Sequence, residues 1–314
     1  MVFSVTILGS SAALPTSQRF STSQLLQAGE RSYLIDCAEG TQIQFRRFHL
    51  PFGNLKAIFI SHLHGDHVFG LPGLLSSLNL LDRKEPLDIF GPAPLEEWIN
   101  GHLKFFAPLS YPLHIHCATC TDMTAIYEDK RITVGCFPLQ HRIPTWGYLF
   151  REKERPANIR KDMIRLYGIP LREIPAIKAG ADYRMPDGKI IPNHLLAFPP
   201  VQPRSYAYCS DTVYLERLPA MLRNVHLLYH EATFANDQKL RSAETFHSTA
   251  EEAATIAKAA NAGKLIIGHF STRYDNLRPL LQEAQAIFKN TEAAEDGKTF
   301  EVKQPSRPTS DHPA

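Results

Sequence analysis

The stretch "IFISHLHGDHVFG", residues 58–70, places three histidines and one aspartate within six positions, directly after an apolar strand-like run. His62 and His64 are two residues apart at the end of an extended segment, so their side chains point the same way, and the following loop can turn Asp66 and His67 toward them. Imidazole suits zinc, and a carboxylate adds a charged oxygen ligand. Neighbours such as Asp66 and His67 diverge, so the pattern predicts ligands divided between two adjacent metal ions.

Further ligands must then come from other parts of the chain. Three candidates directly follow strand-like runs: His141 after "VGCFPLQ", Asp211 after "SYAYCS" and His269 after "KLIIG". The ends of strands are where α/β sheets place their chemistry. A histidine-rich surface loop is the alternative interpretation of the motif, and His141 or Asp211 taken alone would more simply be structural.

The rest of the chain predicts an α/β architecture, because short apolar runs alternate with helical stretches. The 314 residues, 44% of them hydrophobic, suffice for one large domain or two small ones. Helices are expected at 42–48, 71–81, 95–101 and 217–222, and after Ser248, which has capping-box spacing to Glu251. Gly263 is the expected stop of that last helix. The strand-like runs are "SVTIL", "SYLIDC", "KAIFISH", "LDIFG", "ITVGCF", "SYAYCSD", "HLLYHEA" and "KLIIGHF".

Residues 151–192 differ in composition from their surroundings and are interpreted as an insertion into a single domain spanning 1–302. Between Arg151 and Gly180 there are eight basic and four acidic side chains. Such an excess can follow RNA phosphates, although a solvated charged face is the simpler alternative. The basic candidates for RNA contact are Arg155, Arg160, Lys161, Arg165, Arg172 and Lys178. Residues 303–314 are polar and proline-rich, which is typical of a disordered tail.

Composition indicates a cytoplasmic chain that does not enter the membrane. The N-terminal "MVFSVTILGSSAALPT" lacks a basic lead and a long apolar region, so it predicts a first strand and not a signal peptide. No segment approaches the ~20 apolar residues of a membrane helix. The five cysteines are odd in number and scattered, which predicts reduced thiols and no disulfide.

The motif H-x-H-x-D-H resembles that of the metallo-β-lactamase superfamily, and within it the chain is similar to the ribonuclease Z family. That similarity rests on "ILGSSAALPT", "IDCAEGTQIQ", "HGDHVFGLPGLL", "YCSDT", "HEATF", "HST" and "GHFSTRY". It implies a four-layer αββα sandwich, with the insertion as a flexible arm that grips tRNA. It also implies a homodimeric endonuclease that removes the 3′ trailer of tRNA precursors.

The resemblance also assigns the metal ligands by position. His62, His64 and His141 would hold one zinc ion, Asp66, His67 and His269 the other, and Asp211 would bridge the two. Mn²⁺ is an alternative metal in vitro.

Asp66 would in addition orient or deprotonate the attacking water, a catalytic role that the family implies. His247 directly precedes the capped helix, where unpaired N–H groups favour an anion, and is assigned to phosphate stabilisation or to protonation of the leaving oxygen. A neutral histidine that packs the helix start is the alternative. Weaker candidates are Glu231, as a partner of a ligand histidine, and three residues that follow His269 and could contact phosphate: Ser271, Thr272 and Arg273.

Three other interpretations stay open. "HIHCATC" contains His114, His116, Cys117 and Cys120, whose spacing could suit a structural zinc, although a second ligand pair is missing. The protein could instead hydrolyse a small ester, thioester, lactone or phosphodiester. It could also be an RNA-binding protein whose metals are only structural.

Overall fold

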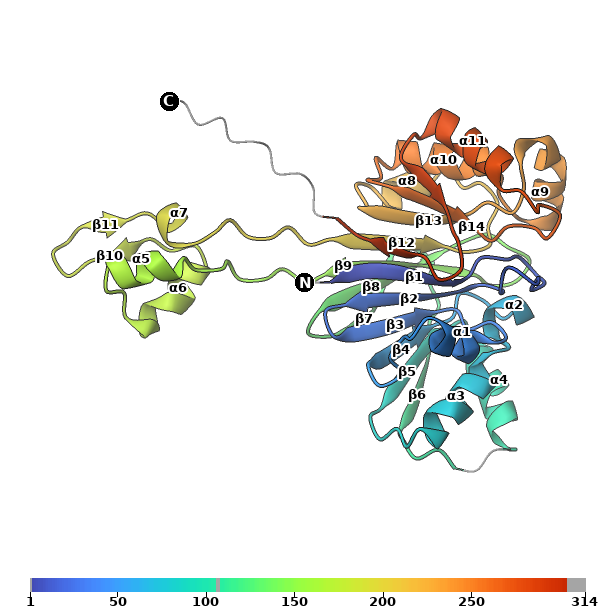
Figure 1. Cartoon of the computed structure of the whole chain (residues 1–314), viewed down its shortest axis with the longest axis horizontal. Coiled ribbons are helices and arrows are strands. Elements are labelled where there is room, and N and C mark those ends of the chain that lie inside the picture. Colours follow the sequence, from blue (N-terminus) through green and yellow to red (C-terminus); the bar gives the residue numbers. More distant parts are fainter. Residues whose placement is uncertain (1, 106–107, 304–314) are drawn as a thin grey trace. The chain divides into compact units, whose positions relative to one another are not determined.

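The computed structural model describes residues 2–105 and 108–303. These residues form two compact units (Figure 1): the main unit, which comprises the chain up to Arg151 and again from Arg204, and the insert unit, Glu152–Pro203. The sequence placed the end of the insertion at Pro192, before the end of this insert unit. The tail predicted at 303–314 lies outside the described residues except for Lys303. None of the helices in the described ranges is long and apolar enough to cross a bilayer.

The first sheet of the main unit has seven strands and carries helices on its outer face (Figure 1). Its order is β16 (Thr299–Glu301), β1 (Phe3–Gly9), β2 (Ser23–Ala28), β3 (Arg31–Ile35), β4 (Leu55–Phe59), β5 (Leu87–Gly91) and β6 (Leu113–Cys117). The strands from β3 to β6 are parallel, and β1 pairs antiparallel with both of its neighbours. The helices packed against it are α1 (Thr41–Arg47), α3 (Leu71–Leu80) and α4 (Leu95–Leu103).

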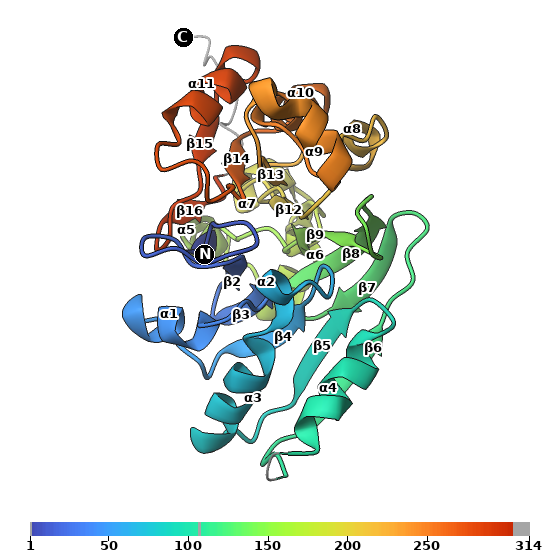
Figure 2. The same ribbon diagram turned by 90° about the vertical axis from the view of Figure 1, so that its right-hand side faces the viewer.

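The second sheet also has seven strands and is covered by the C-terminal helices (Figure 2). Its order is β15 (Thr291–Ala293), β14 (Leu265–Gly268), β13 (Leu227–Glu231), β12 (Ser205–Cys209), β9 (Trp146–Glu152), β8 (Ile132–Pro138) and β7 (Thr124–Glu128). The helices on its side are α8 (Leu218–Met221), α9 (Lys239–Thr245), α10 (Ala250–Ala259) and α11 (Arg278–Ile287). The two sheets and two helix layers are the αββα sandwich expected from the resemblance.

Alternation of side chains along the inner strands produces these layers. Leu26 and Phe59 belong to the core between the sheets, whereas their neighbours Leu25 and Ile58 pack on the helix side of the first sheet. Successive strand residues face opposite sides of a sheet, so a strand that is apolar at every position is buried on both faces. All seven residues of β1 are buried for this reason.

The insert unit has a small apolar core of its own. It consists of α5 (Lys161–Leu166), a 3₁₀ turn at Leu171–Glu173, α6 (Ile174–Lys178), the hairpin β10 (Tyr183–Arg184) and β11 (Ile190–Ile191), and α7 (Asn193–Leu196). Its buried residues are Ala157, Ile169, Ile177, Tyr183, Ile191, Leu196 and Ala197.

The basic residues of the insert unit differ in how far they are engaged. Lys161, Arg165 and Arg172 are exposed, and Lys178 is half-buried. Arg155 donates to Glu152 at 2.6 Å, and the Arg160 guanidinium lies over the Phe198 ring, 4.7 Å from its centre. Arg172 lies 3.3 Å from Glu173, and two further basic residues, Arg184 and Lys189, are exposed in the hairpin, so the exposed basic side chains are spread over the insert unit.

The N-cap of α10 lies one residue later than the sequence predicts. Thr249 accepts from the Glu252 N–H, and the Glu252 carboxylate accepts from the Thr249 N–H, which completes a capping box. Ser248 instead donates its hydroxyl to the Thr212 carbonyl. The helix ends at Ala259, and Gly263 follows in the turn, where a Cβ would lie 2.6 Å from a backbone oxygen.

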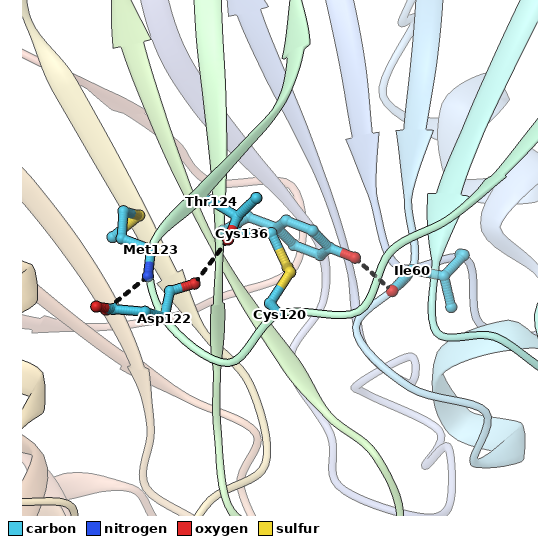
Figure 3. The surroundings of a disulfide bond; sticks show 7 residues. Ile60, Cys120, Asp122, Met123, Thr124 and Cys136 are labelled. Carbon is cyan, nitrogen blue, oxygen red and sulfur yellow. Dashed lines mark hydrogen bonds between the residues drawn. A yellow bond between two sulfur atoms is a disulfide. The ribbon is translucent and has the colours of Figure 1, made fainter.

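The prediction that all cysteines are reduced is wrong. Cys120 and Cys136 form a disulfide between the segment after β6 and strand β8 (Figure 3). The fold brings their Cα atoms to 6.4 Å, within the range of ordinary disulfides, a proximity that sequence spacing does not reveal. The bond also removes Cys120 from the ligand set of the "HIHCATC" zinc site. His116 and His114 of that segment lie 2.8 and 3.4 Å from Asp88.

Candidate metal centre

The histidine-rich motif lies where β4 ends and the short helix α2 (Gly65–Val68) begins (Figure 2). His62 and His64 precede α2, and Asp66 and His67 are within it. Gly70, just after α2, packs so closely that a Cβ would lie 1.9 Å from the Ala38 carbonyl oxygen. Only glycine permits this approach, which holds the motif against the preceding loop.

Three histidines converge on one oxygen of Asp211. His64 Nδ1 lies 3.1 Å from His62 Nε2 and 3.2 Å from His141 Nε2. Asp211 Oδ2 lies 3.6 Å from His62 Nε2 and 3.8 Å from His141 Nε2. These four side chains present one donor atom each within 4.8 Å of one another, and they could hold a metal ion.

A second donor set converges on the other oxygen of Asp211. Asp211 Oδ1 lies 3.2 Å from His269 Nε2 and 3.4 Å from His67 Nε2. Asp66 Oδ2 lies 3.5 Å from each of these two nitrogens. Asp66, His67 and His269 are the second group that could hold an ion. The structure thus brings all seven predicted ligand residues together, with Asp211 between the two groups.

The atoms at the middle of this cluster fit a divalent metal. His67 Nε2, His269 Nε2 and Asp211 Oδ1 are buried without a hydrogen-bond partner, which is costly for polar atoms unless an ion completes their coordination. Burial lowers the pKa of His62, so this imidazole is neutral and free to bind metal. Around His67, burial lowers the pKa but the carboxylates of Asp211 and Asp66 outweigh it and raise the pKa well above its ordinary value. The cluster therefore favours a bound cation.

Asp36 fixes His67 from behind and was not among the predicted site residues. Its Oδ2 lies 2.8 Å from His67 Nδ1 and accepts from the hydroxyls of Ser61 at 2.8 Å and Tyr208 at 2.6 Å. The Ser61 N–H donates to its other oxygen at 2.7 Å. A carboxylate on the far nitrogen of a metal-binding histidine sets the tautomer and orients the ring. Here it presents His67 Nε2 to the centre.

Two other ligand histidines are held in the same way. His141 Nδ1 donates to the Phe246 carbonyl at 2.8 Å. His269 Nδ1 lies 2.9 Å from the Thr233 hydroxyl, which donates to Glu231 Oε2 at 2.7 Å. Glu231 therefore reaches His269 through Thr233, a residue that the sequence analysis did not single out. Each ring turns its Nε2 atom toward the metal-binding groups.

His247 lies beside the cluster and is tied to Glu231. Its Nδ1 is 2.9 Å from Glu231 Oε1 and 4.0 Å from Asp211 Oδ2. Burial lowers the pKa of His247, but the Glu231 carboxylate outweighs this effect and raises the pKa to about 9. The Glu231 carboxylate therefore favours the protonated form of His247, in which Nδ1 is bonded to Glu231 and the Nε2 proton is left to donate.

A cleft of about 280 Å³ opens above these groups. The predicted phosphate-contact residues Ser271, Thr272 and Arg273 all line it, as do Asp66 and His247. Two arginines that the sequence did not predict as site residues also line it, Arg142 and Arg241.

The chain is similar to known proteins along nearly its whole length. It is 49% identical over 290 residues to Ribonuclease Z of Phocaeicola vulgatus, covering 92% of this chain and 94% of that protein. It is 48% identical over 295 residues to Ribonuclease Z of Porphyromonas gingivalis, covering 94% and 97%. The crystal structure of human tRNase Z, short form, matches with a TM-score of 0.71 at 27% identity, covering 96% of this chain and 99% of that one.

A family model described as "Anti-Pycsar protein Apyc1" matches residues 3–106, a minority of the chain that includes the histidine-rich motif. The ribonuclease Z relatives, in contrast, are nearly half identical to this chain and match it almost from end to end. The chain therefore belongs to the ribonuclease Z family.

Proposed function

We propose that this protein is a zinc-dependent endoribonuclease that removes the 3′ trailer of tRNA precursors and leaves a 3′-hydroxyl on the tRNA. The observation that carries the proposal is the Asp211 carboxylate, whose two oxygens face two separate donor sets. The relatives named Ribonuclease Z and the human tRNase Z structure support the choice of substrate.

The donor chemistry supports two Zn²⁺ ions, one per donor set, with Mn²⁺ as an alternative in vitro. His62, His64 and His141 would hold the first, and Asp66, His67 and His269 the second, with Asp211 shared. When bound, such a metal pair supplies charge stabilisation for the scissile phosphate and a water of lowered pKa. The protein's own side chains orient that water, hold the phosphate and move the protons.

Asp66 is the residue placed to orient the attacking water. Its Oδ2 accepts from the Ala13 N–H at 2.8 Å, which fixes the carboxylate against the N-terminal loop. The side chain is 11% exposed and lines the cleft, so it is reachable by solvent and substrate. The neighbouring histidines hold the pKa of Asp66 below its usual range against the effect of burial, so the carboxylate is ionised and can hold a metal ion and accept a hydrogen bond from the water.

His247 would protonate the leaving O3′ atom or stabilise the phosphate. Its protonated form is favoured by Glu231, and it lines the cleft and lies within 4.0 Å of Asp211. A positioned imidazolium can donate a proton as the bond to the leaving oxygen breaks.

The insert unit is proposed as the tRNA-binding arm of the molecule. Lys161, Arg165 and Arg172 are exposed basic side chains, and such residues neutralise RNA phosphates in a salt-dependent way. A homodimer, which the family resemblance implies, and a cytoplasmic location, which the composition predicts, complete the proposal. Light scattering of the purified protein tests the dimer.

One assay tests the proposed function. The purified protein, loaded with zinc, is incubated with a tRNA precursor that carries a 3′ trailer, and both product ends are mapped. A cut near the discriminator base that leaves a 3′-hydroxyl on the tRNA is expected. Cleavage of small esters or diesters without tRNA processing would support the small-molecule hydrolase, and tight RNA binding without any cleavage would support the RNA-binding protein.

A further inference from the structure

The rim of the cleft carries three arginines, whereas its floor carries the histidines and aspartates of the metal-binding groups. Arg142, Arg241 and Arg273 are exposed and come from three segments: the loop after β8, helix α9 and the loop after β14. Guanidinium groups stay protonated at every working pH and match phosphate oxygens with two parallel N–H groups. The cleft therefore has a permanently positive rim.

Arg142 and Arg241 belong to one side of this rim. Arg142 Nη2 donates to the Glu244 carbonyl at 3.5 Å, in the last turn of α9, the helix that carries Arg241. The Thr245 hydroxyl donates to the Arg241 carbonyl at 2.8 Å, which ties the same turn together. A guanidinium has five N–H donors, so one long bond leaves most of the Arg142 donors for a ligand.

The same helix end is connected to the centre. The Ser242 hydroxyl donates to the His247 carbonyl at 2.7 Å, and the His247 N–H donates to the Ser242 carbonyl at 2.9 Å. Phe246, between them, accepts from His141 Nδ1. An anion held by Arg142 and Arg241 would therefore keep a fixed place relative to the scissile position, which is the condition for positioning to accelerate a reaction.

We propose that Arg142 and Arg241 form a second phosphate subsite that binds the phosphate next to the scissile one. The inference rests on the proposed function, because it takes RNA as the substrate. It explains how the site would prefer a polynucleotide to a single phosphodiester. A cleft of about 280 Å³ is near the lower end of ligand pockets and holds little more than the reacting group. The neighbouring phosphate then falls at the rim, where these two arginines are.

The subsite is tested with the double variant Arg142→Gln/Arg241→Gln on two substrates, a tRNA precursor with a 3′ trailer and bis(p-nitrophenyl) phosphate. Arg223→Gln, an exposed arginine outside the cleft, is the matched control. One charge-assisted bond is worth roughly tenfold or more, so loss of two should lower kcat/KM on the RNA by about 100-fold or more and that on the diester by much less. The control should match the unmodified protein on both substrates.

A modified substrate tests whether the two arginines bind a phosphate. A neutral methylphosphonate replaces the linkage next to the scissile bond, on either side in turn. On one side it should slow the unmodified protein to the rate of the double variant, and the double variant should not respond to it. Equal losses on both substrates would mean that Arg142 only supports α9, and no loss on RNA would mean that the phosphate is bound elsewhere; either result overturns the inference.

A binding measurement separates this inference from the proposed function. If the unmodified protein fails to cut tRNA precursors, the proposed function is wrong, but the subsite can still be measured. In an Asp66→Ala background, the two Arg→Gln substitutions should weaken binding of a fluorescein-labelled, 3′-extended oligoribonucleotide about tenfold, with a shallower salt dependence. Unchanged affinity would overturn the subsite.

Discussion

Asp211 connects the two donor sets, and two other aspartates, Asp66 and Asp36, hold different places around the same centre. Its two oxygens lie 3.6 and 3.4 Å from the nearest nitrogens of the motif histidines His62 and His67. Asp66 lies at the cleft surface, whereas Asp36 lies behind His67 in the buried interior. The three aspartates therefore predict three different phenotypes.

Asp66→Ala should lower RNA turnover while leaving RNA affinity nearly unchanged. In the proposed function the carboxylate orients the water and lies away from the body of the tRNA, and loss of a general acid–base group typically costs about 10²–10⁴-fold. Single-turnover rates and RNA binding are measured on samples of verified metal content. Turnover within a few-fold of the unmodified protein would remove Asp66 from the catalytic role.

Asp36→Asn should weaken metal binding without unfolding the protein. Asp36 has a φ of 55°, a conformation that asparagine adopts as readily as aspartate, so the variant keeps the backbone and removes the negative charge behind His67. Loss of such a partner costs about 10–100-fold in metal affinity. Zinc affinity is measured by competition with a chelator, and circular dichroism checks the fold. Unaltered affinity would show that Asp36 only fills space.

The ligand-type residues could be predicted from the sequence, but not the groups that hold them. The rule that selects His141 and Asp211, a polar side chain directly after an apolar strand, applies equally to Asp36 after "SYLI". Such a carboxylate can lie among the metal ligands or behind a ligand histidine. For Asp36 the outcome depends on its positive φ and on the hydrogen bond from Tyr208 of the other sheet. A linear sequence carries neither.

At the scale of elements, the disulfide should make a measurable contribution to stability. Its cysteines are 16 positions apart, and closing a loop of about that length stabilises a fold by about 3 kcal/mol. The double variant Cys120→Ala/Cys136→Ala should therefore unfold at lower urea concentration, with dithiothreitol shifting the unmodified protein the same way. Cys209→Ala removes a buried free thiol and keeps the disulfide, so this control should still respond to the reductant, whereas the double variant should not.

Thiol counting checks the same bond directly. Alkylation of unreduced, denatured protein should label Cys37, Cys117 and Cys209 but neither of the other two cysteines. Labelling of all five without a reductant would contradict the disulfide.

The insert unit provides the second prediction at this scale. Replacing Glu154–Val201 with a short glycine linker should weaken tRNA precursor cleavage and largely spare bis(p-nitrophenyl) phosphate. All seven ligand residues lie in the main unit, and the insert unit's apolar core is made only of its own described residues. Remote phosphate contacts add affinity and positioning that a small substrate never uses. KM for tRNA should rise and its salt dependence should become shallower.

A charge-only variant serves as the control for that deletion. Gln at Lys161, Arg165 and Arg172 keeps the insert unit folded and should reproduce part of the loss on tRNA. If the deletion lowers both activities equally, the segment supports the centre; if it lowers neither, tRNA is bound elsewhere.

Elements were predictable where burial on both faces makes a strand continuously apolar, as in "KAIFISH" and "KLIIGHF". Strands with polar positions, such as β2 and β7, gave no clear signal. The start of α10 was ambiguous because Ser248 and Thr249 both have a glutamate three residues on. The structure decides for Thr249, since Ser248 donates its N–H to Glu231 and so belongs to the support of the centre.

For the whole molecule, the proposed function requires that the sandwich, the donor sets and the insert unit act on one substrate. The sandwich brings strand ends from both sheets to one cleft, so that residues that follow β4, β8, β12 and β14 meet there. The insert unit is built on its own core and supplies exposed basic side chains. Neither the small-molecule hydrolase nor the RNA-binding protein needs both features.

The most direct test is to titrate metal-free protein with zinc while measuring bound zinc and the rate of 3′-trailer removal from a tRNA precursor. The rate should rise with occupancy and saturate at two zinc ions per chain. Asp211→Ala should bind fewer than two and stay inactive, because one lost residue removes a ligand from both ions. Full activity without metal or at one ion per chain, or two retained ions in Asp211→Ala, would contradict a centre of two ions bridged by Asp211.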